Sequence, residues 1–457
     1  MNKETSMKLE KNFKTSYTRI FAIIYFIQGI SLSLFTTVIP IYLILQLEAL
    51  EATGISTLCT IVLLPFAVKF IYGLLSDKYH FKRIGRRKPW IIGASILAGT
   101  TWLFLPFLVT EFNPLIAYMI GGLIISVGMA ISDTAIDGMI LDNCPKEQLG
   151  RVQGICWGFR SVGMILGGPL VVAVYILIGI NIEIIFISYG FIVISTCFLV
   201  LIVEESFIIN EINLIENLKT VFGKKKNWTV FSFAFFNAFV DGVIFLFVSL
   251  FILFQTGDLT FQGGTINTSA IEENKYLYGS NAFISFIIGA GVIMGAIVGG
   301  YIADFKSRKG SFYTALIVTT VSLIVFIIPA PFWLLLIFAF FIGSSNGLRI
   351  SGFSAIVGQI SKLYPEIDST YYATCNSFQN IGTQLGLISI NIILVLSSQL
   401  SYYTTFLIIF IFLAMASNIG IIPFLFLNSE EYELPKSYKE NILKEKKVLN
   451  KSAEALD

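Results

Sequence analysis

Long apolar runs alternate with short polar segments along almost the whole chain. A membrane-spanning helix needs about 20 apolar residues, and twelve runs of roughly that length can be delimited. They cover residues 17–45, 53–76, 90–110, 114–142, 152–178, 182–203, 228–256, 276–303, 311–330, 332–360, 370–397 and 402–427. The pattern therefore predicts an all-α membrane protein with about 12 transmembrane helices.

The polar segments divide these runs into two groups of six. We predict a cytoplasmic N-terminus at 1–16, a six-helix bundle at 17–203, a cytoplasmic amphipathic linker at 204–227, a second bundle at 228–428 and a cytoplasmic tail at 429–457. Apolar residues recur every three or four positions through the linker, which predicts a helix lying at the membrane surface. The tail is highly charged and is predicted to be disordered.

Composition and charge support this topology. Hydrophobic residues make up 55% of the 457 positions and charged residues 13%, whereas a soluble domain has about 25% charged residues. Nearly all of the 31 Lys and Arg residues lie in segments that the alternation places on the side of the N-terminus, and Lys275 lies on the other side. The positive-inside rule then places both termini in the cytoplasm. We expect a plasma-membrane protein, with an organelle membrane as the alternative.

Three pairs of short motifs recur in the same order in the two halves. They are Gln28-Gly29 with Asp241-Gly242, Gly73-x-x-x-Asp77 with Gly300-x-x-x-Asp304, and Gly163-x-x-x-Gly167 with Gly382-x-x-x-Gly386. Ordered repeats at a nearly constant offset predict two pseudo-symmetric bundles that arose by duplication.

The segment between the second and third runs carries the most specific motif. It runs Gly73-Leu-Leu-Ser-Asp77-Lys-Tyr-His-Phe-Lys-Arg83-Ile-Gly85-Arg86-Arg87-Lys88, and it resembles the cytoplasmic signature loop of the major facilitator superfamily. The resemblance implies the major facilitator fold and secondary transport by alternating access.

A latch made by this loop is the mechanism that we expect. Gly73 would let the helix end approach a neighbour, and Asp77 would pair with a guanidinium among Arg83, Arg86 and Arg87. The latch would break when the cytoplasmic side opens. The alternative is that these cations only set the topology. The second half has a shorter copy, with Asp304 and Arg308 as its charged residues.

Three further segments carry a narrower resemblance. Residues 64–77, 132–138 and 158–164 look like a cluster of families that includes the muropeptide permeases, the acetyl-coenzyme A transporters and the folate-biopterin transporters. The likeness covers about residues 63–168, and Ser132 stands where the cluster usually has glutamine. It implies an acetyl-coenzyme A, muropeptide or pterin-like substrate.

Ionisable residues inside the spans are candidate functional groups because they are costly in a bilayer. Asp133 and Asp137 lie four residues apart and share a helix face within about 40°. Either can pair with Arg160 or Lys69, and such pairs would serve the site or only lock helices together. Lys69 can alternatively extend toward the cytoplasm. Asp142 lies near the cytoplasmic end and is predicted to be a gate residue.

The superfamily resemblance also implies which helices line the central cavity, namely the first, fourth, seventh and tenth. Besides Asp133 and Asp137, the candidate residues for substrate binding and coupling are Tyr25, Gln28, Asn237, Asp241, Asn346 and Arg349. Asp241 lies roughly 20 Å into its span and is predicted to respond to protons, the alternative being a plain structural pair with Arg349.

The residue inventory narrows the function further. The five cysteines have no metal-ligand spacing, and no nucleotide-binding loop or Ser/His arrangement occurs, so we expect no cofactor, no metal and no enzymatic activity. Cations within the spans suggest an anionic metabolite as cargo, and the carboxylates suggest proton symport. A channel, a solute sensor on the same fold and an intramembrane enzyme are the alternatives. The expected partners are a small-molecule substrate, protons and the lipid bilayer, without nucleic acid, around a monomer.

Overall fold

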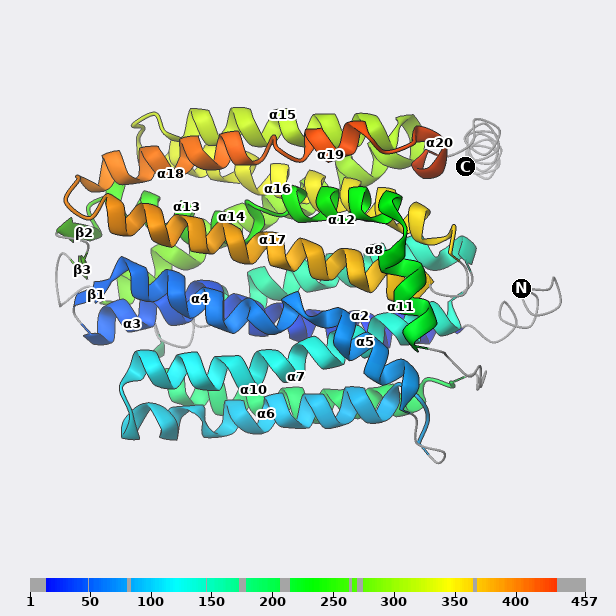
Figure 1. The fold of residues 1–457 in the computed structure, drawn as a ribbon. Helices are drawn as coiled ribbons and strands as arrows, with labels where there is room; N and C mark the ends of the chain where they lie inside the picture. The colour runs from blue at the N-terminus through cyan, green and yellow to red at the C-terminus, as the bar shows by residue number, and fades with distance from the viewer. Residues whose placement is uncertain are drawn as a thin grey trace, which may run out of the picture.

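Long helices lie side by side with nearly parallel axes, which gives the protein two ends (Figure 1). The computed structural model describes residues 14–47, 49–79, 84–144, 146–171, 178–205, 214–262, 265–268, 274–364 and 368–433. Within these ranges, ten helices are long and apolar enough to cross a membrane. The prediction of an all-α membrane protein is confirmed.

The first half contains six helical segments, several of which change helix type along their length. They are α2 (Thr15–Ser33) with the π-helical turn η1 (Leu34–Val38) and α3 (Ile39–Leu47), α4 (Ala52–Ala67) with α5 (Lys69–Lys78), α6 (Lys88–Glu111), α7 (Pro114–Asn143), α8 (Lys146–Val162) with the π-helical η2 (Gly163–Leu170), and α10 (Ile182–Cys197) with the 3₁₀-helical η3 (Phe198–Ile202).

The second half repeats the arrangement. Its elements are α12 (Lys225–Asn237) with α13 (Asp241–Gln255), α14 (Asn274–Tyr301) with the π-helical η5 (Ile302–Lys306), α15 (Arg308–Phe326), α16 (Phe332–Ser361), α17 (Asp368–Leu396), and α18 (Tyr402–Ala416) with α19 (Ile421–Leu425) and the short α20 (Ser429–Tyr432). The ten candidate spans omit the fifth and seventh predicted runs. The fifth continues into residues outside the description, and the seventh is broken between α12 and α13.

Within the described residues, three short strands that the sequence did not predict form one sheet that crosses between the two halves. They are β1 (Ala49–Glu51), β2 (Leu259–Gln262) and β3 (Thr265–Thr268), in the order β1-β3-β2. Strand β1 of the first half pairs antiparallel with β3 of the second half, with Leu50 opposite Ile266. We call the end of the bundle where they lie the strand end (Figure 1).

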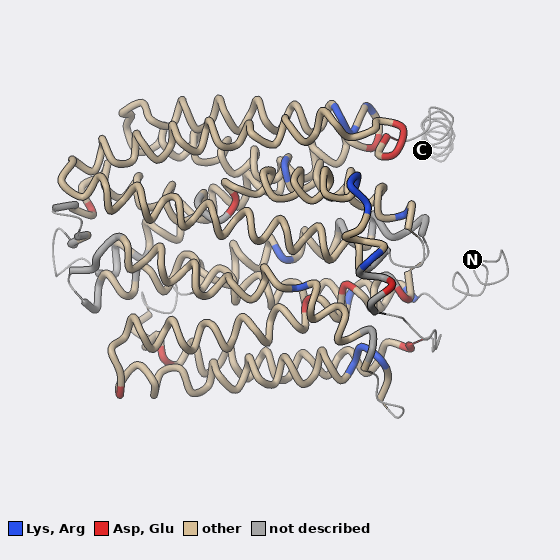
Figure 2. Tube along the Cα trace, viewed as in Figure 1, with Lys and Arg blue, Asp and Glu red and all other residues tan. Residues whose placement is uncertain are grey.

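Basic residues gather at the opposite end, beside α20 (Figure 2). We call this the basic end and define it by Arg87, Lys224, Lys309 and Lys362. The helix α11 (Leu214–Gly223) of the predicted linker also lies here, and its Val221 and Phe222 pack against the second half. Part of the linker, residues 206–213, and the tail from residue 434 lie outside the described residues.

Glycines set matching helix contacts in the two halves. In the first half, a side chain at Gly163 would collide with the carbonyl group of Phe26, and in the second half one at Gly382 would collide with that of Phe235. The backbones of the fifth and first spans, and of the eleventh and seventh, are therefore in close contact, as the repeated glycine motif predicts.

The same packing revises one predicted equivalence between the halves. Gln28 follows Phe26 by two residues, and Asn237 follows Phe235 by two residues. Asn237 therefore takes the structural place of Gln28, and the predicted equivalence of Gln28 with Asp241 is wrong by one helical turn. The break between α12 and α13 accounts for the difference, because it gives the seventh span a feature that the first span lacks.

Candidate functional site

A cavity of about 860 Å³ lies between the two halves. Its first-half wall comes from α2, η1, α4, α5, α8 and η2, and its second-half wall comes mainly from α13, α14, α16 and α17. Asp304, Arg308 and Lys362 also line it, so the cavity extends to the basic end. The candidate site therefore draws on both halves of the chain.

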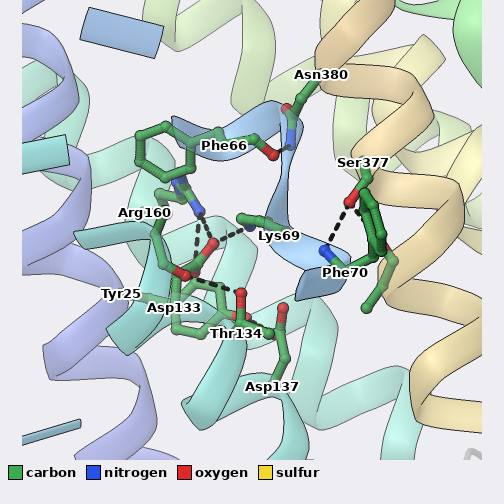
Figure 3. Close-up of polar contacts among 12 residues, drawn as sticks. Tyr25, Phe66, Lys69, Phe70, Asp133, Thr134, Asp137, Arg160, Ser377 and Asn380 are labelled. Atoms are coloured by element: carbon green, nitrogen blue, oxygen red, sulfur yellow. Dashed lines mark hydrogen bonds and ion pairs between the residues drawn. The ribbon is translucent and has the colours of Figure 1, made fainter. Parts of the chain in front are cut away.

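The first-half wall carries a charge cluster of Lys69, Asp133 and Arg160. The ammonium group of Lys69 donates to Asp133, and the Nη1 atom of Arg160 lies 3.3 and 3.4 Å from the two carboxylate oxygens (Figure 3). The side chain of Asp133 is only 2% exposed. The predicted pairing is present, and Lys69 lies against Asp133 instead of extending toward the cytoplasm. Two buried cations on one carboxylate offset much of the cost of burying all three.

Asp137, one turn further along α7, has a different partner. The hydroxyl group of Tyr25 donates to its carboxylate, and the Tyr25 ring packs edge-on against Trp157 at 6.0 Å between centroids. Helical spacing alone could not distinguish Asp133 from Asp137, because both lie on one face. The structure separates them into an ion-paired carboxylate and a hydroxyl-bonded one.

The second-half side carries buried polar groups of another kind. The Nε atom of Arg349 lies 3.6 Å from Oδ1 of Asp241, which is too long for a hydrogen bond. Among the residues that the structure describes, no hydrogen-bond partner reaches any guanidinium nitrogen of Arg349, the side-chain oxygen of Asn346, or the amides of Asn237 and Gln384. We call these five residues the polar cluster.

The break in the seventh span brings these groups together. Asn237 is the last residue of α12 and Asp241 the first of α13, so the Asp241 carboxylate lies at a helix N-terminus, where negative charge is favoured. Gly382 and Gly386 let α17 pack directly on the backbone at this point. This contact brings Gln384 to the cavity wall. Gln28 of the first span is likewise buried without a partner within the described ranges.

The predicted gating residues are distributed differently. Arg87 is buried at the basic end, where its Nε donates to Asp142 at 3.1 Å and its Nη1 to Ser76 at 2.7 Å. Arg86 donates its backbone N–H to Glu205. Arg83 and the side chain of Asp77 lie outside what the structure describes. The latch around Asp77 and the gate role of Asp142 therefore stay predictions, and the structure adds that Asp142 is bonded to Arg87 at the basic end.

Gly73 makes no close backbone contact in this structure. A methyl group at Gly73 would lie 3.5 Å from the side chain of Thr134 and 4.0 Å from that of Ala373, which is ordinary packing distance. The close contacts occur instead on α14, where Gly291 and Gly295 press against the backbone of α16, as their spacing predicts.

Two acidic residues that the sequence reasoning missed cap matching helices. The carboxylate of Glu205 accepts backbone N–H groups from Arg87 and Lys88, at 3.1 and 3.0 Å, where α6 begins. In the second half, Glu433 accepts the N–H of Lys309 at 2.9 Å, where α15 begins. Asp304 and Arg308 line the cavity beside this cap. The sequence signal for these caps was an acidic residue soon after the last apolar run of each half.

The five cysteines lie inside the protein as small buried side chains. All five, Cys59, Cys144, Cys156, Cys197 and Cys375, are buried and unbonded to one another. In the described part of the chain, no three His, Cys, Asp or Glu residues are grouped so that they could hold a metal ion.

Two related bundles of membrane-length helices around a central cavity define a membrane carrier fold, and comparison with known proteins gives the family. The family model described as Major Facilitator Superfamily matches residues 21–270, more than half of the chain. The chain belongs to this superfamily, which consists of membrane transporters and not of enzymes, and the protein is a multi-pass integral membrane protein. The predicted superfamily is confirmed.

Individual relatives agree with this assignment. A protein of Arabidopsis thaliana named as probable folate-biopterin transporter 4 is 26% identical over 209 residues, which cover 45% of this chain and 41% of the relative. The match thus spans about two fifths of that relative's length. The predicted likeness to folate-biopterin transporters is confirmed.

Solved structures show the fold over nearly the whole chain. The nucleoside transporter NupG superimposes with a TM-score of 0.64 at 15% identity, covering 89% of this chain and 99% of that one. The D-xylose-proton symporter superimposes with a TM-score of 0.67 at 13% identity, covering 92% and 99%.

Proposed function

We propose that this chain is a secondary active transporter that moves a small polar solute across its membrane by alternating access. The observation that carries the proposal is the cavity between the halves, whose second-half side carries buried polar groups without partners. Buried polar groups without partners cost free energy, and a solute that pairs with them would recover it. Membership of a transporter superfamily supports the same conclusion.

The direction of the opening follows from charge. By the positive-inside rule, the basic end faces the cytoplasm, so both termini lie there and the cavity opens inward. At the strand end, β1 and β3 connect the halves and would close the cavity from outside. Alternating access requires these strands to part while the basic end closes. We place the protein in the plasma membrane as a monomer.

The polar cluster favours a solute with both an anionic group and amide-like groups. The guanidinium of Arg349 presents several N–H donors in a fork that suits a carboxylate, and the amides of Asn346 and Gln384 can each donate and accept hydrogen bonds. Folate and biopterin carry such ring amides, and folate also carries carboxylates. A pterin-like substrate is therefore our first choice, followed by acetyl-coenzyme A and muropeptides.

Asp241 gives the cluster a route to proton coupling. Its carboxylate is 17% exposed, lines the cavity and forms a long ion pair with the buried Arg349. Protonation of Asp241 would remove its attraction for the guanidinium and release Arg349 to bind an anionic solute. A proton and an anion would then cross together, which is symport.

Counterflow in liposomes tests the function. Protein-containing liposomes are preloaded with unlabelled biopterin, folate or acetyl-coenzyme A, and uptake of the same labelled compound is followed. A carrier gives a saturable, transient accumulation of label, and a channel gives flux without accumulation. A sensor gives binding without flux. Absence of accumulation for a compound that binds would contradict the proposal.

A further inference from the structure

The second span is broken beside the charge cluster. Helix α4 ends at Ala67 and α5 begins at Lys69, and Val68 between them has non-helical dihedral angles, with φ −106° and ψ 20°. Pro65 lies in the last turn before the break. The N–H that Pro65 lacks would have bonded to Ile61 in the preceding turn, so the proline does not by itself account for the non-helical angles of Val68.

Side chains from the other half form hydrogen bonds with two backbone groups that the break leaves without their helical partners. In an unbroken helix, the N–H of Phe70 would donate to the carbonyl group of Phe66. Here the Phe70 N–H donates to Oγ of Ser377 at 2.9 Å, and the Phe66 carbonyl accepts from Nδ2 of Asn380 at 2.8 Å (Figure 3). Both side chains belong to α17. The second half thus replaces one helical hydrogen bond of the first half.

Lys69 lies between these two backbone groups. Its buried ammonium group donates to Asp133. The direction of its Cα–Cβ bond depends on the backbone geometry of the break. Closing the Phe66–Phe70 hydrogen bond would wind this turn into a regular helix. The turn would then carry the Lys69 side chain around the helix axis and away from its present alignment with Asp133.

We propose that Ser377 and Asn380 are positioning residues that hold the break open and thereby direct Lys69 at Asp133. Separation of the second and eleventh spans would withdraw both side chains, and Phe70 would then bond to Phe66 within its own helix. The Phe66 carbonyl and the Phe70 N–H would then keep a partner in both states, as a nonpolar environment requires. The place of this switch in a transport cycle rests on the proposed function, whereas its control of Lys69 does not.

Another contact along the same helix pair supplies the control. Nδ2 of Asn391 on α17 donates to Oγ1 of Thr57 on α4 at 3.1 Å. This bond also joins the two halves through an asparagine of α17, yet Thr57 lies far from the break in sequence. Its loss weakens the interface without acting on Lys69.

A double-mutant cycle on the purified full chain tests the inference. The thermal unfolding midpoint is measured for Asn380→Ala and Asn391→Ala, each in the wild-type and in the Lys69→Gln background. Lys69→Gln leaves Asp133 paired with Arg160. We expect Asn380→Ala to lower the midpoint by several degrees in wild type and by less than half as much in Lys69→Gln. Asn391→Ala should cost the same in both backgrounds, because independent sites are additive.

Equal losses from Asn380→Ala in both backgrounds would show a cap that acts independently of Lys69 and would overturn the inference. If Asn380→Ala does not fold, the same cycle is measured with Ser377→Ala. The variant Ser377→Thr, which keeps the hydroxyl group, should have the wild-type midpoint. A lower midpoint for Ser377→Thr would also count against the inference. If the Asn380 and Lys69 substitutions prove independent while counterflow is observed, this inference alone is refuted. If the two substitutions interact but no probe is transported, only the proposed function is refuted.

Discussion

The charge cluster and the polar cluster both contain residues that line the same cavity, but their hydrogen bonding differs. In the charge cluster, the Asp133 carboxylate meets two cations, and both bonds are buried. In the polar cluster, the Arg349 guanidinium is fully buried and its nearest carboxylate, that of Asp241, lies beyond hydrogen-bond distance. Similar residue types thus form a satisfied network in one half and an unsatisfied one in the other.

This difference assigns different roles to the two halves. A satisfied ion pair has little to gain from a solute, so the charge cluster serves mainly to hold the second, fourth and fifth spans in place. Donors and acceptors without hydrogen-bond partners gain most when a solute arrives, so we propose that the polar cluster serves mainly to bind it. The asymmetry predicts that variants of the first cluster change stability and variants of the second change binding.

Removal of the Asp133 charge should give the largest effect. Asp133→Asn leaves Lys69 and Arg160 buried without their carboxylate, which typically costs about 3–5 kcal/mol. We expect a large fall in the thermal midpoint of the purified protein. Asp137→Asn is the matched control, because its amide oxygen can still accept from Tyr25. Equal midpoints for the two variants would contradict a structural role for the charge cluster.

Arg349→Gln should weaken solute binding while changing stability little. A hydrogen bond to a charged group contributes about 1.5–3 kcal/mol, so affinity should fall by a factor of roughly ten or more. Binding of biopterin and folate to the purified protein measures this, alongside the thermal midpoint without ligand. Unchanged affinity with a much lower midpoint would make Arg349 a structural residue and remove the proposed contrast.

Asp241→Asn should abolish the pH dependence of uptake. The neutral amide imitates a protonated carboxylate and leaves Arg349 released at every pH. Uptake into liposomes across a range of internal and external pH provides the measurement. Asp137→Asn, which alters a carboxylate of the other half, should keep the wild-type profile. A profile that survives Asp241→Asn would exclude this carboxylate as the coupling group.

Gln384→Ala should have the smallest effect of the four. One neutral hydrogen bond contributes about 0.5–1.5 kcal/mol, which corresponds to a loss of affinity of several-fold. The comparison is with Asn391→Ala, which shortens another amide on α17 that does not line the cavity. If both substitutions weaken binding equally, the effect belongs to the helix and not to the polar cluster.

Much of the fold could be predicted because a bilayer restricts what a chain can do. Spans need long apolar runs and cations favour one side, so the helices and the charge asymmetry follow from residue type and order. The pairing of β1 with β3 could not be predicted, because strands as short as Ala49–Glu51 carry no periodic signal. The two caps depend on a carboxylate meeting a helix start far away in sequence, as Glu205 does at Lys88.

The site was predictable as a set of residues but not as a set of contacts. Polar residues in apolar spans identified Asp133, Arg160, Asp241 and Arg349, whereas helix geometry alone could not say which of them pair. The role of α17 was missed, although its polar residues between Ser377 and Gln384 recur along one apolar span.

Distances between paired spin labels would test alternating access most directly, without requiring a known substrate. One pair would join the exposed Phe112 and Leu400 at the strand end, and another the exposed Tyr79 and Lys309 at the basic end, in a background without the native cysteines. The account predicts that shifting the pH, or adding biopterin, lengthens one distance as it shortens the other. If neither the distance at the strand end nor the distance at the basic end changes under any condition, the account is contradicted.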